Sequence, residues 1–464
     1  MITNLQAENF KSWSDTGAIR MAPLTGLFGT NSSGKTALLQ VLLMLKQTVE
    51  SVDRSRVLHT GDERTYVDLG TFYDVMHGHG LPGVIKLSLE WTLPRPLRIL
   101  DPEKPVDQTL FSIKELAFET MVEGTTDSVS VLKFEYRFTS RDHEYRFGMQ
   151  RKDPEPTDNR TEYELIAEGY DMKRTRGRAW PLPQPVKSYG FPDQVNAYYQ
   201  NAGFLSLFVL AFEQLFQNLY YLGPLREYPH RSYVWAGEKP QDVGRRGELA
   251  VHALLAARKL GKTISRGKAR HRQTVEERVA EWLRNLGMID TFDLRQIAEN
   301  RKEYEVRVRR SPTASEVLIT DVGFGVSQIL PVLVLCYYAP EHSTIILEQP
   351  EIHLHPAVQA GLADVFVDAI KTRHVQIILE SHSEHLLRRL QRRIAEEALA
   401  HDDAALYFIA TEGGQSRLQP LHLDLFGNIM NWPAGFFGDE MEDLVAMSEA
   451  ELRRRQAEGG TQPA

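Results

Sequence analysis

A phosphate-binding loop is the clearest chemical feature near the start of the chain. Its residues fit the pattern G-x-x-x-x-G-K-[ST], in which glycines let successive backbone N–H groups surround an anion. Lys35 is expected to reach the β- and γ-phosphates of a nucleotide, and the Thr36 hydroxyl is expected to bind Mg²⁺. The predicted binding residues are Gly29, Thr30, Asn31, Ser32, Ser33, Gly34, Lys35, Thr36 and Ala37.

The segments on either side of this loop are those that a phosphate-binding loop requires. Residues 25–28 are predicted to end a strand, and the strongly apolar residues 37–45 are predicted to form a helix. The helix would begin at the loop, so the positive end of its dipole would face the phosphates. The sequence therefore predicts a site for a nucleoside triphosphate.

An acidic cluster in the last third of the chain is the second candidate element of this site. It reads Glu348-Gln349-Pro350-Glu351 and directly follows an apolar strand predicted at 344–347. A carboxylate at the C-terminal end of a strand faces the crevice where ligands bind in open α/β sheets. Glu348 is therefore predicted to be the carboxylate that holds Mg²⁺. The alternative interpretation is a solvated glutamate that only ends a strand.

Composition places the chain among soluble globular proteins. At 464 residues, 42% of them apolar, it is long enough for two or three domains with substantial cores. The net charge of −8 argues against a protein that is basic overall, and the one cysteine, Cys336, excludes a disulfide framework or a cysteine zinc site. The longest apolar run, residues 329–339, is too short to cross a bilayer, and the N-terminus lacks a signal-peptide pattern. We therefore expect a cytoplasmic protein with no membrane partner.

Strand patterns dominate the part of the chain that follows the first helix. Strands are predicted at 84–91, 128–136 and 163–166, with proline- and charge-rich breaks at 94–105 and 152–160. These strands are expected to form an antiparallel lobe beside the nucleotide.

The middle of the chain is predicted to be irregular at first and then helical. Residues 171–198 are proline-rich and are expected to be irregular. Helical periodicity returns at 248–260 and 274–286, and a β-hairpin is predicted from 304–309 and 316–320.

The last third of the chain alternates apolar strands with helices. Besides the strand at 344–347, strands are predicted at 375–379 and 405–409, and helices at 356–370 and 384–400. This alternation is typical of a parallel sheet that is covered on both faces.

Five motifs in this order resemble the ABC-type ATPases of the RecF, SMC and OLD (overcoming lysogenization defect) group. They are Asn9–Trp13, the phosphate loop, the signature-like Asp321–Gln328, Glu348–Pro356 and Glu380–His385. The resemblance predicts an α/β fold: an ABC-type, SMC/RecF-like ATPase head with an antiparallel β lobe, a mainly parallel core sheet and a helical insertion. The predicted divisions are an N-terminal ATPase lobe at 1–170, an irregular and helical insertion at 171–300, a C-terminal ATPase lobe at 301–440 and a polar tail at 441–464.

The chain also resembles the AAA_15-type ATPases of bacterial defence systems, such as OLD proteins and the PtuA ATPase of Septu. The segment Leu423–Phe437 is similar to a terminus common in that group. The resemblance implies ATP and Mg²⁺ as cofactors and a head-to-tail dimer around ATP. OLD proteins carry a nuclease domain after the ATPase, whereas only residues 410–464 follow the last strand predicted here. The effector, a nuclease or toxin, is therefore expected to be a separate protein.

The resemblance assigns roles to residues outside the phosphate loop. Gly323, Gly325 and Ser327 would bind the γ-phosphate across the dimer interface, and His382 would sense it. For Gly323, Gly325 and Ser327, the alternative is a glycine turn in which Ser327 caps a helix. For His382, the alternative is a structural histidine. A further pair, His353 and His355, is expected in a loop at the dimer interface rather than at a metal.

Two positions depart from the pattern of this group. Gln349 stands where hydrolysing members carry the general-base glutamate, and an amide cannot accept a proton from water at neutral pH. It can orient the attacking water, and Glu351 or His382 are the alternative bases. Residues 67–72, where a Mg²⁺-contacting glutamine is expected, contain none, so no residue is assigned there.

The sequence leaves three functions open. The favoured one is an ATP-dependent, dimerising ATPase that senses or regulates a separate effector in bacterial anti-phage defence. The second is a RecF-like DNA-binding ATPase of repair or clamp type, and the third is an inactive scaffold. DNA contact would use two basic segments. They comprise residues 258–262 with Arg266, Lys268, Arg270 and Arg272, and the helical row Arg388, Arg389, Arg392 and Arg393.

Two other sets of residues have competing interpretations. Arg226 follows an apolar run that is predicted to end near the crevice, where it pairs with the signature region or forms a structural ion pair. The acidic residues after the last predicted strand are interpreted as a solvated surface rather than as metal ligands. They are Asp424, Asp439, Glu440, Glu442 and Asp443.

Overall fold

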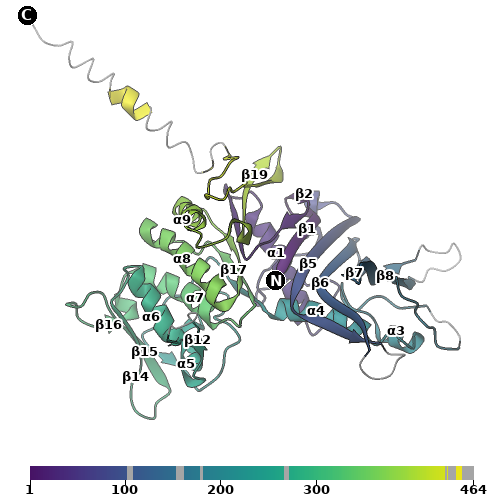
Figure 1. The fold of residues 1–464 in the computed structure, drawn as a ribbon, viewed down its shortest axis with the longest axis horizontal. Helices are drawn as coiled ribbons and strands as arrows, with labels where there is room; N and C mark the ends of the chain where they lie inside the picture. The colour runs from purple at the N-terminus through teal and green to yellow at the C-terminus, as the bar shows by residue number, and fades with distance from the viewer. Residues whose placement is uncertain are drawn as a thin grey trace, which may run out of the picture.

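The core of the molecule is a six-stranded sheet that brings together strands from distant parts of the chain (Figure 1). The computed structural model describes residues 1–101, 108–152, 161–177, 181–265, 271–433, 436 and 446–451. The strand order is β10-β17-β18-β4-β19-β20, and β20 alone is antiparallel to its neighbour in this sheet. The bounds are β4 (Leu24–Gly29), β10 (Leu219–Leu222), β17 (Thr344–Glu348), β18 (Gln376–Glu380), β19 (Ala404–Glu412) and β20 (Gln415–Pro420).

Two hydrophobic clusters cover the two faces of this sheet. In β17, Ile345 and Leu347 belong to one cluster and Ile346 belongs to the other, because side chains alternate between the faces of a strand. The same alternation recurs in β18. All five residues of each strand are buried, as expected for strands that are covered on both faces. The predicted parallel sheet with two covered faces is confirmed.

Helices cover the core sheet on both faces. Helix α1 belongs to the cluster shared with the β lobe, and α5 to α9 belong to the opposite cluster. The helices predicted in the second half are confirmed, although α9 ends five residues before position 400. Among the described residues, no helix combines the length and apolarity needed to span a bilayer. The bounds are α1 (Lys35–Glu50), α5 (Ala250–Lys259), α6 (Val275–Asn285), α7 (Phe324–Tyr338), α8 (Pro356–Arg373) and α9 (Glu384–Ala395).

An antiparallel sheet of eight strands forms the β lobe, on one side of the core sheet in Figure 1. Its order is β2-β1-β5-β6-β7-β8-β9, with β3 paired to β1. The predicted antiparallel lobe is confirmed, but β6 and β8 were not predicted. The bounds are β1 (Ile2–Phe10), β2 (Trp13–Asp15), β3 (Ile19–Arg20), β5 (Gly83–Leu100), β6 (Thr109–Gly124), β7 (Val129–Ser140), β8 (His143–Arg151) and β9 (Tyr163–Glu168).

Strand β5 passes through the first predicted break. Pro94 and Pro96 lie inside it, where its register with β6 shifts between Thr92 and Leu97. Proline is tolerated at such irregularities because its missing N–H leaves no ladder bond unmade. The prediction of a strand that ends at residue 91, followed by a break at 94–105, is therefore wrong as far as Leu100. Most of the second predicted break, residues 153–160, lies outside the described residues.

The range 171–300 contributes to three parts of the molecule. Its first helices are α3 (Asp193–Tyr198) and α4 (Leu205–Gln217), and α4 packs into the β lobe. Phe212 of α4 lies 4.5 Å from Phe118 of β6 between ring centroids. The same range supplies β10 to the core sheet, so it holds a core strand in addition to helices. Short helices elsewhere are α2 (Phe72–Val75), η1 (His77–His79), η2 (Ile319–Asp321) and η3 (His401–Asp403).

A third, antiparallel sheet lies with α5 and α6 on the side of the molecule away from the β lobe (Figure 1). The predicted hairpin is confirmed as β15 and β16, whereas β14 was not predicted. A capping box starts α6: Thr274 accepts from the Glu277 backbone N–H, and Glu277 accepts from that of Thr274. The strands of the third sheet are β11 (Tyr233–Val234), β14 (Thr291–Gln296), β15 (Glu303–Arg309) and β16 (Val317–Leu318). Nearby in the sequence, β12 (Thr263–Ile264) and β13 (Gln273–Thr274) form a separate two-stranded sheet.

Candidate nucleotide-binding site

The predicted phosphate loop joins the end of β4 to the start of α1. Gly29 ends β4 with φ 137°, and Gly34 precedes α1 with φ 99°, both in the left-handed region that favours glycine. A Cβ atom on Gly34 would lie 2.3 Å from Ser416 Oγ and 2.6 Å from Ser12 Oγ. The Trp13 indole N–H also donates to the Gly34 carbonyl at 3.0 Å. The loop is therefore held in a shape that only glycine allows at this position.

Lys35 folds back over its own loop. Its Nζ donates to the carbonyls of Gly29 at 3.1 Å and Thr30 at 2.5 Å. Burial lowers the pKa of Lys35, while the carboxylates of Glu380 and Glu351 raise it. The ammonium group is thus placed at the loop, where phosphate oxygens would be better partners than neutral carbonyls.

The Thr36 hydroxyl contacts a residue that was not among the predicted site residues. It donates to Glu380 Oε2 at 2.8 Å. Glu380 ends β18, which lies directly beside β4, whereas Glu348 ends β17, one strand further away. The two glutamates are register partners across β17 and β18. Like Glu348, Glu380 ends an apolar strand, which was the available sequence signal, but the strand order decides which of them meets Thr36.

Glu348 lies in a buried polar group on the far side of Glu380. The Tyr221 hydroxyl, from the end of β10, donates to Glu348 Oε1 at 3.1 Å. The Arg226 Nη2 group lies 3.5 Å from the Glu348 carbonyl oxygen. Burial, and then the nearby Glu380 carboxylate, raises the pKa of Glu348 to about 7. A cation at this position would favour the ionised form.

The turns that follow β17 and β18 are hydrogen-bonded to each other. Glu351 Oε1 accepts from Ser381 Oγ at 2.8 Å and from the His382 backbone N–H at 2.7 Å. The Gln349 N–H donates to the Glu380 carbonyl at 2.9 Å, and Gln349 has φ 43°, which is unusual for a residue other than glycine. The acidic cluster and the histidine turn are therefore held as one unit.

His382 lies at the phosphate-loop side of this unit. Partial burial and the Lys35 ammonium lower its pKa, and its contact with the Gly29 backbone raises it. The structure thus brings together the predicted residues of both ends of the chain. They are Lys35, Thr36, Glu348, Gln349, Glu351 and His382.

The signature-like segment begins α7, as its position before a helix predicted. Gly323 is the N-cap residue and is exposed, whereas Ser327 is buried in the first turn and donates to the Phe324 carbonyl at 2.7 Å. The alternative in which Ser327 caps the helix is therefore wrong. Two rings lie near the Phe324 ring at this helix start. The distance between ring centroids is 5.6 Å to Tyr228 and 5.4 Å to His353. The second histidine of the predicted pair, His355, is the N-cap residue of α8, and its Nδ1 accepts from the Ala357 N–H at 3.3 Å.

The donor atoms at this edge of the sheet fit Mg²⁺ that arrives with a nucleotide. The Thr36 hydroxyl and the carboxylates of Glu380 and Glu348 are hard oxygen ligands, which Mg²⁺ prefers. Within the described part of the chain, no group of three or more His, Cys, Asp or Glu side chains could hold a metal by itself. Mg²⁺ commonly binds one or two carboxylates together with phosphate oxygens and water, so the phosphates would complete its coordination.

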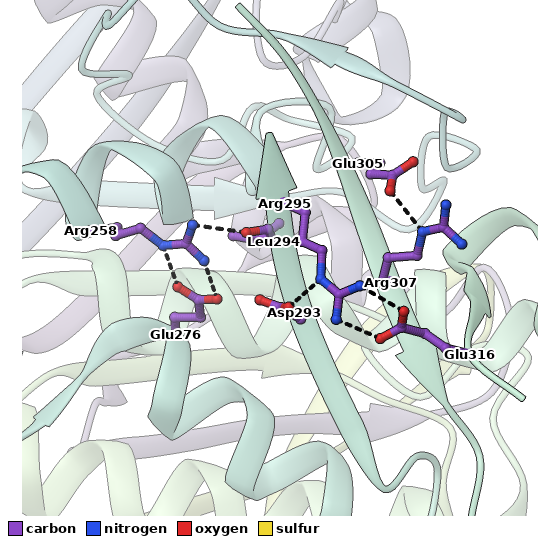
Figure 2. A network of polar contacts seen from close by, with 8 residues as sticks. All are labelled: Arg258, Glu276, Asp293, Leu294, Arg295, Glu305, Arg307 and Glu316. Atoms are coloured by element: carbon purple, nitrogen blue, oxygen red, sulfur yellow. Dashed lines mark hydrogen bonds and ion pairs between the residues drawn. The ribbon is translucent and has the colours of Figure 1, made fainter. Parts of the chain in front are cut away.

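The basic residues proposed for DNA contact are largely paired with carboxylates of the same chain. Arg258 binds Glu276 through two nitrogens and also donates to the Leu294 carbonyl at 2.9 Å (Figure 2). In the α9 row, Arg389 and Arg393 pair with Asp364, Arg388 pairs with Glu384, and Arg392 pairs with Glu396. Arg272 donates to Thr263. Arg266, Lys268 and Arg270 lie outside the described residues, as do Asp439, Glu440, Glu442 and Asp443.

Pairing of this kind extends over the third sheet. Figure 2 shows Arg295 between Asp293 and Glu316, with both guanidinium Nη atoms 2.8 Å from Glu316 oxygens. Arg307 pairs with Glu305 at 2.7 Å. Because these cations are matched by anions, the described surface of this sheet offers little net positive charge to a phosphate backbone.

Family comparisons match the second half of the chain. Residues 238–388 match a family model described as "AAA domain, putative AbiEii toxin, Type IV TA system". Residues 399–447 match a model described as "Protein of unknown function (DUF3696)". No curated protein matches the chain. The first of these matches makes residues 238–388 similar to an AAA-type ATPase domain.

Solved structures similar to this chain include SMC head domains. The SMC head domain of Thermotoga maritima is 11% identical, with a TM-score of 0.38, and covers 91% of this chain and 99% of its own. A Pyrococcus furiosus Smc head bound to the C-terminal domain of ScpA is 10% identical, with a TM-score of 0.44 and coverages of 91% and 96%. A SmcHead bound to the C-winged helix domain of ScpA is 11% identical, with a TM-score of 0.43 and coverages of 91% and 98%. The sheets and helices of this chain themselves form a mixed α/β fold.

Proposed function

We propose that the chain binds ATP with Mg²⁺, joins a second copy head to tail around the nucleotide, and so controls a separate effector, a nuclease or toxin, in bacterial anti-phage defence. The observation that carries this proposal is the Thr36 hydroxyl, 2.8 Å from the buried Glu380 carboxylate beside the phosphate loop. This arrangement supplies phosphate donors and Mg²⁺ ligands at one edge of the core sheet. Thr36, Glu380 and Glu348 are the proposed Mg²⁺ ligands.

The start of α7 is the surface proposed to meet the nucleotide of a second copy. Gly323 is exposed there, and the first backbone N–H groups of a helix have no partner within it. Together with the helix dipole, they favour an anion such as the γ-phosphate. Phe324 and Tyr228, 41% and 67% exposed, add an apolar surface that a second copy would cover. Since Ser327 is buried, Gly323 and Gly325 are the proposed main contacts.

Two observations support regulation rather than rapid turnover. The family model that matches residues 238–388 is described as "AAA domain, putative AbiEii toxin, Type IV TA system", which supports a place in defence. In addition, Gln349 stands at the position proposed for the water-activating residue, and an amide can orient water but cannot take its proton. Slow hydrolysis would let ATP act mainly as a clamp between two copies. The pairing of Arg258 and of the α9 arginines within the chain favours this function over the DNA clamp.

Replacement of the phosphate-loop lysine tests the nucleotide site and the dimer together. We expect Lys35→Ala to weaken binding of ATPγS by about 100-fold, since it removes charged hydrogen bonds to phosphate. We further expect it to abolish the dimer that the wild type forms with ATPγS and Mg²⁺. Isothermal titration and native mass measure the two effects, with the exposed Lys371→Ala as the control. Wild-type binding strength in Lys35→Ala would disprove the site.

The two carboxylates at the sheet edge should differ in their effect on Mg²⁺. We expect Glu380→Gln to lower the Mg²⁺-dependent gain in ATPγS affinity by about tenfold or more, because Glu380 is the carboxylate in contact with Thr36. Glu348→Gln should have the smaller effect. The measurement is ATPγS titration at a series of Mg²⁺ concentrations. In EDTA, the reference condition, the wild type and both variants should bind ATPγS with the same affinity. A larger loss in Glu348→Gln would show that the Thr36–Glu380 contact does not mark the metal site.

A glutamate at position 349 should speed up hydrolysis. We expect Gln349→Glu to raise ATP turnover by about 100-fold, because a positioned carboxylate can accept the proton of the attacking water. Phosphate release measures turnover, and Gln296→Glu, on the exposed part of β14, is the control. Turnover that stays flat or falls would point to Glu351 or His382 as the base.

The effector should be recovered with the chain itself. We expect a stoichiometric second protein when the tagged chain is purified from its native host in ATP and Mg²⁺, and we expect this protein to be missing from the Lys35→Ala preparation. Native mass measures the stoichiometry and peptide mass spectrometry names the partner. A bare dimer that retains DNA would instead support the DNA clamp.

A further inference from the structure

Arg226 is a buried arginine whose side chain has almost no hydrogen-bond partner. Its side chain is only 6% exposed, and its Nε and Nη1 groups contact no acceptor among the described residues. The one contact it makes, from Nη2 to the Glu348 carbonyl, is 3.5 Å long. Burial lowers the pKa of Arg226 to about 10, so the guanidinium is still charged at neutral pH. An unpaired buried charge of this kind is costly and is normally matched by an anion.

The neighbouring carboxylates are already turned toward other donors. Glu348 Oε1 accepts from Tyr221, and Glu351 Oε1 accepts from Ser381 and from the His382 N–H. Glu351 Oε2 is buried without a partner, yet it makes no hydrogen bond with Arg226. The guanidinium therefore lies beside these carboxylates but donates no hydrogen bond to any of their oxygens.

The position of Arg226 places it in line with the phosphate loop along the edge of the core sheet. The loop follows β4, and the next three strands in order carry Glu380, Glu348 and, four residues after β10, Arg226. Neighbouring strands lie about 4.8 Å apart, so β10 is roughly 10 Å from β18. Because Thr36 faces Glu380, a nucleotide bound at the loop with its Mg²⁺ on this side would point its terminal phosphate toward Arg226.

We propose that Arg226 binds the γ-phosphate of ATP in the same chain and makes the site prefer ATP to ADP. A guanidinium matches two phosphate oxygens with parallel hydrogen bonds, from Nη2 together with either Nε or Nη1. In Arg226, Nε and Nη1 have no partner among the described residues, and Nη2 makes only the long contact with the Glu348 carbonyl, which uses one of its two N–H bonds. This role rests on the proposed function, and it assigns to Arg226 the discrimination between the two nucleotides.

The contact would also connect the nucleotide to the proposed dimer surface. Arg226 and Tyr228 are two residues apart in the segment between β10 and β11, and the Tyr228 ring lies 5.6 Å from that of Phe324 at the start of α7. The backbone of this segment is anchored elsewhere, because the N–H groups of Gly223 and Glu227 donate to the Arg245 and Arg246 carbonyls. A γ-phosphate held by Arg226 would therefore be connected through this anchored segment to the surface that meets the second copy, and ADP would lack this connection.

The test compares ATPγS and ADP in the full chain with Mg²⁺. We expect Arg226→Met to weaken ATPγS binding by about tenfold or more and to leave ADP binding unchanged, since only ATPγS carries the third phosphate. Arg226→Lys, which keeps the charge but loses the planar fork, should show a smaller loss of the same kind. Lys35→Ala should weaken both nucleotides. Isothermal titration measures the affinities of the wild type and of the three variants for both nucleotides.

The controls separate this role from a structural one. Arg373 is also buried, at 4% exposed, but is paired with Glu341 and the Ala339 carbonyl, so Arg373→Met should lower the melting temperature without changing the ratio of the two affinities. If Arg226→Met does not fold, Arg226→Lys carries the test. An Arg226 variant that loses ATPγS and ADP affinity equally, or loses neither, would overturn the inference while the proposed function stands. A wild type that binds neither nucleotide would overturn both.

Discussion

The parallel pairing of β4 with β18 is the contact on which the candidate site depends. Because the two strands run in the same direction, the phosphate loop after β4 and Glu380 at the end of β18 reach the same edge of the sheet. A hydrogen bond of 2.8 Å from the Thr36 hydroxyl to Glu380 connects the two. The next strands, β17 and β10, add Glu348 and Tyr221 in turn. A shift of one residue in any of these registers would turn a strand-end side chain to the opposite face.

Three buried carboxyl groups and two buried cations lie close together at this edge of the sheet. Glu348, Glu351 and Glu380 are at most 6% exposed, and burial raises the pKa of each. The buried cations nearby, Lys35 and Arg226, are not hydrogen-bonded to any of these carboxylate groups. Mg²⁺ would favour the ionised carboxylates, and phosphate would satisfy the cations. The bound nucleotide would therefore stabilise the folded chain, as any ligand of the native state does.

The two turns beyond β17 and β18 are joined by hydrogen bonds. The Gln349 N–H is bonded to the Glu380 carbonyl, and Glu351 accepts from both Ser381 and His382. A change in the position of His382 would consequently move the acidic cluster as well. The β lobe and the α5–α6 region lie on opposite sides of the core sheet in Figure 1, and each shares a hydrophobic cluster with one face of that sheet.

Local patterns in the sequence were sufficient to predict the phosphate loop, the helix after it, and the apolar strands with their terminal glutamate Glu348, because each depends on neighbouring residues. The parallel sheet followed from the alternation of strands and helices. Strand order is different, since it depends on pairings between residues hundreds of positions apart. Only the tertiary structure decided that Glu380 meets Thr36, that β5 continues past Pro94, and that the α9 arginines are paired with carboxylates. The unpaired state of Arg226 was likewise decided by burial, which is a property of the packed chain and not of its local sequence.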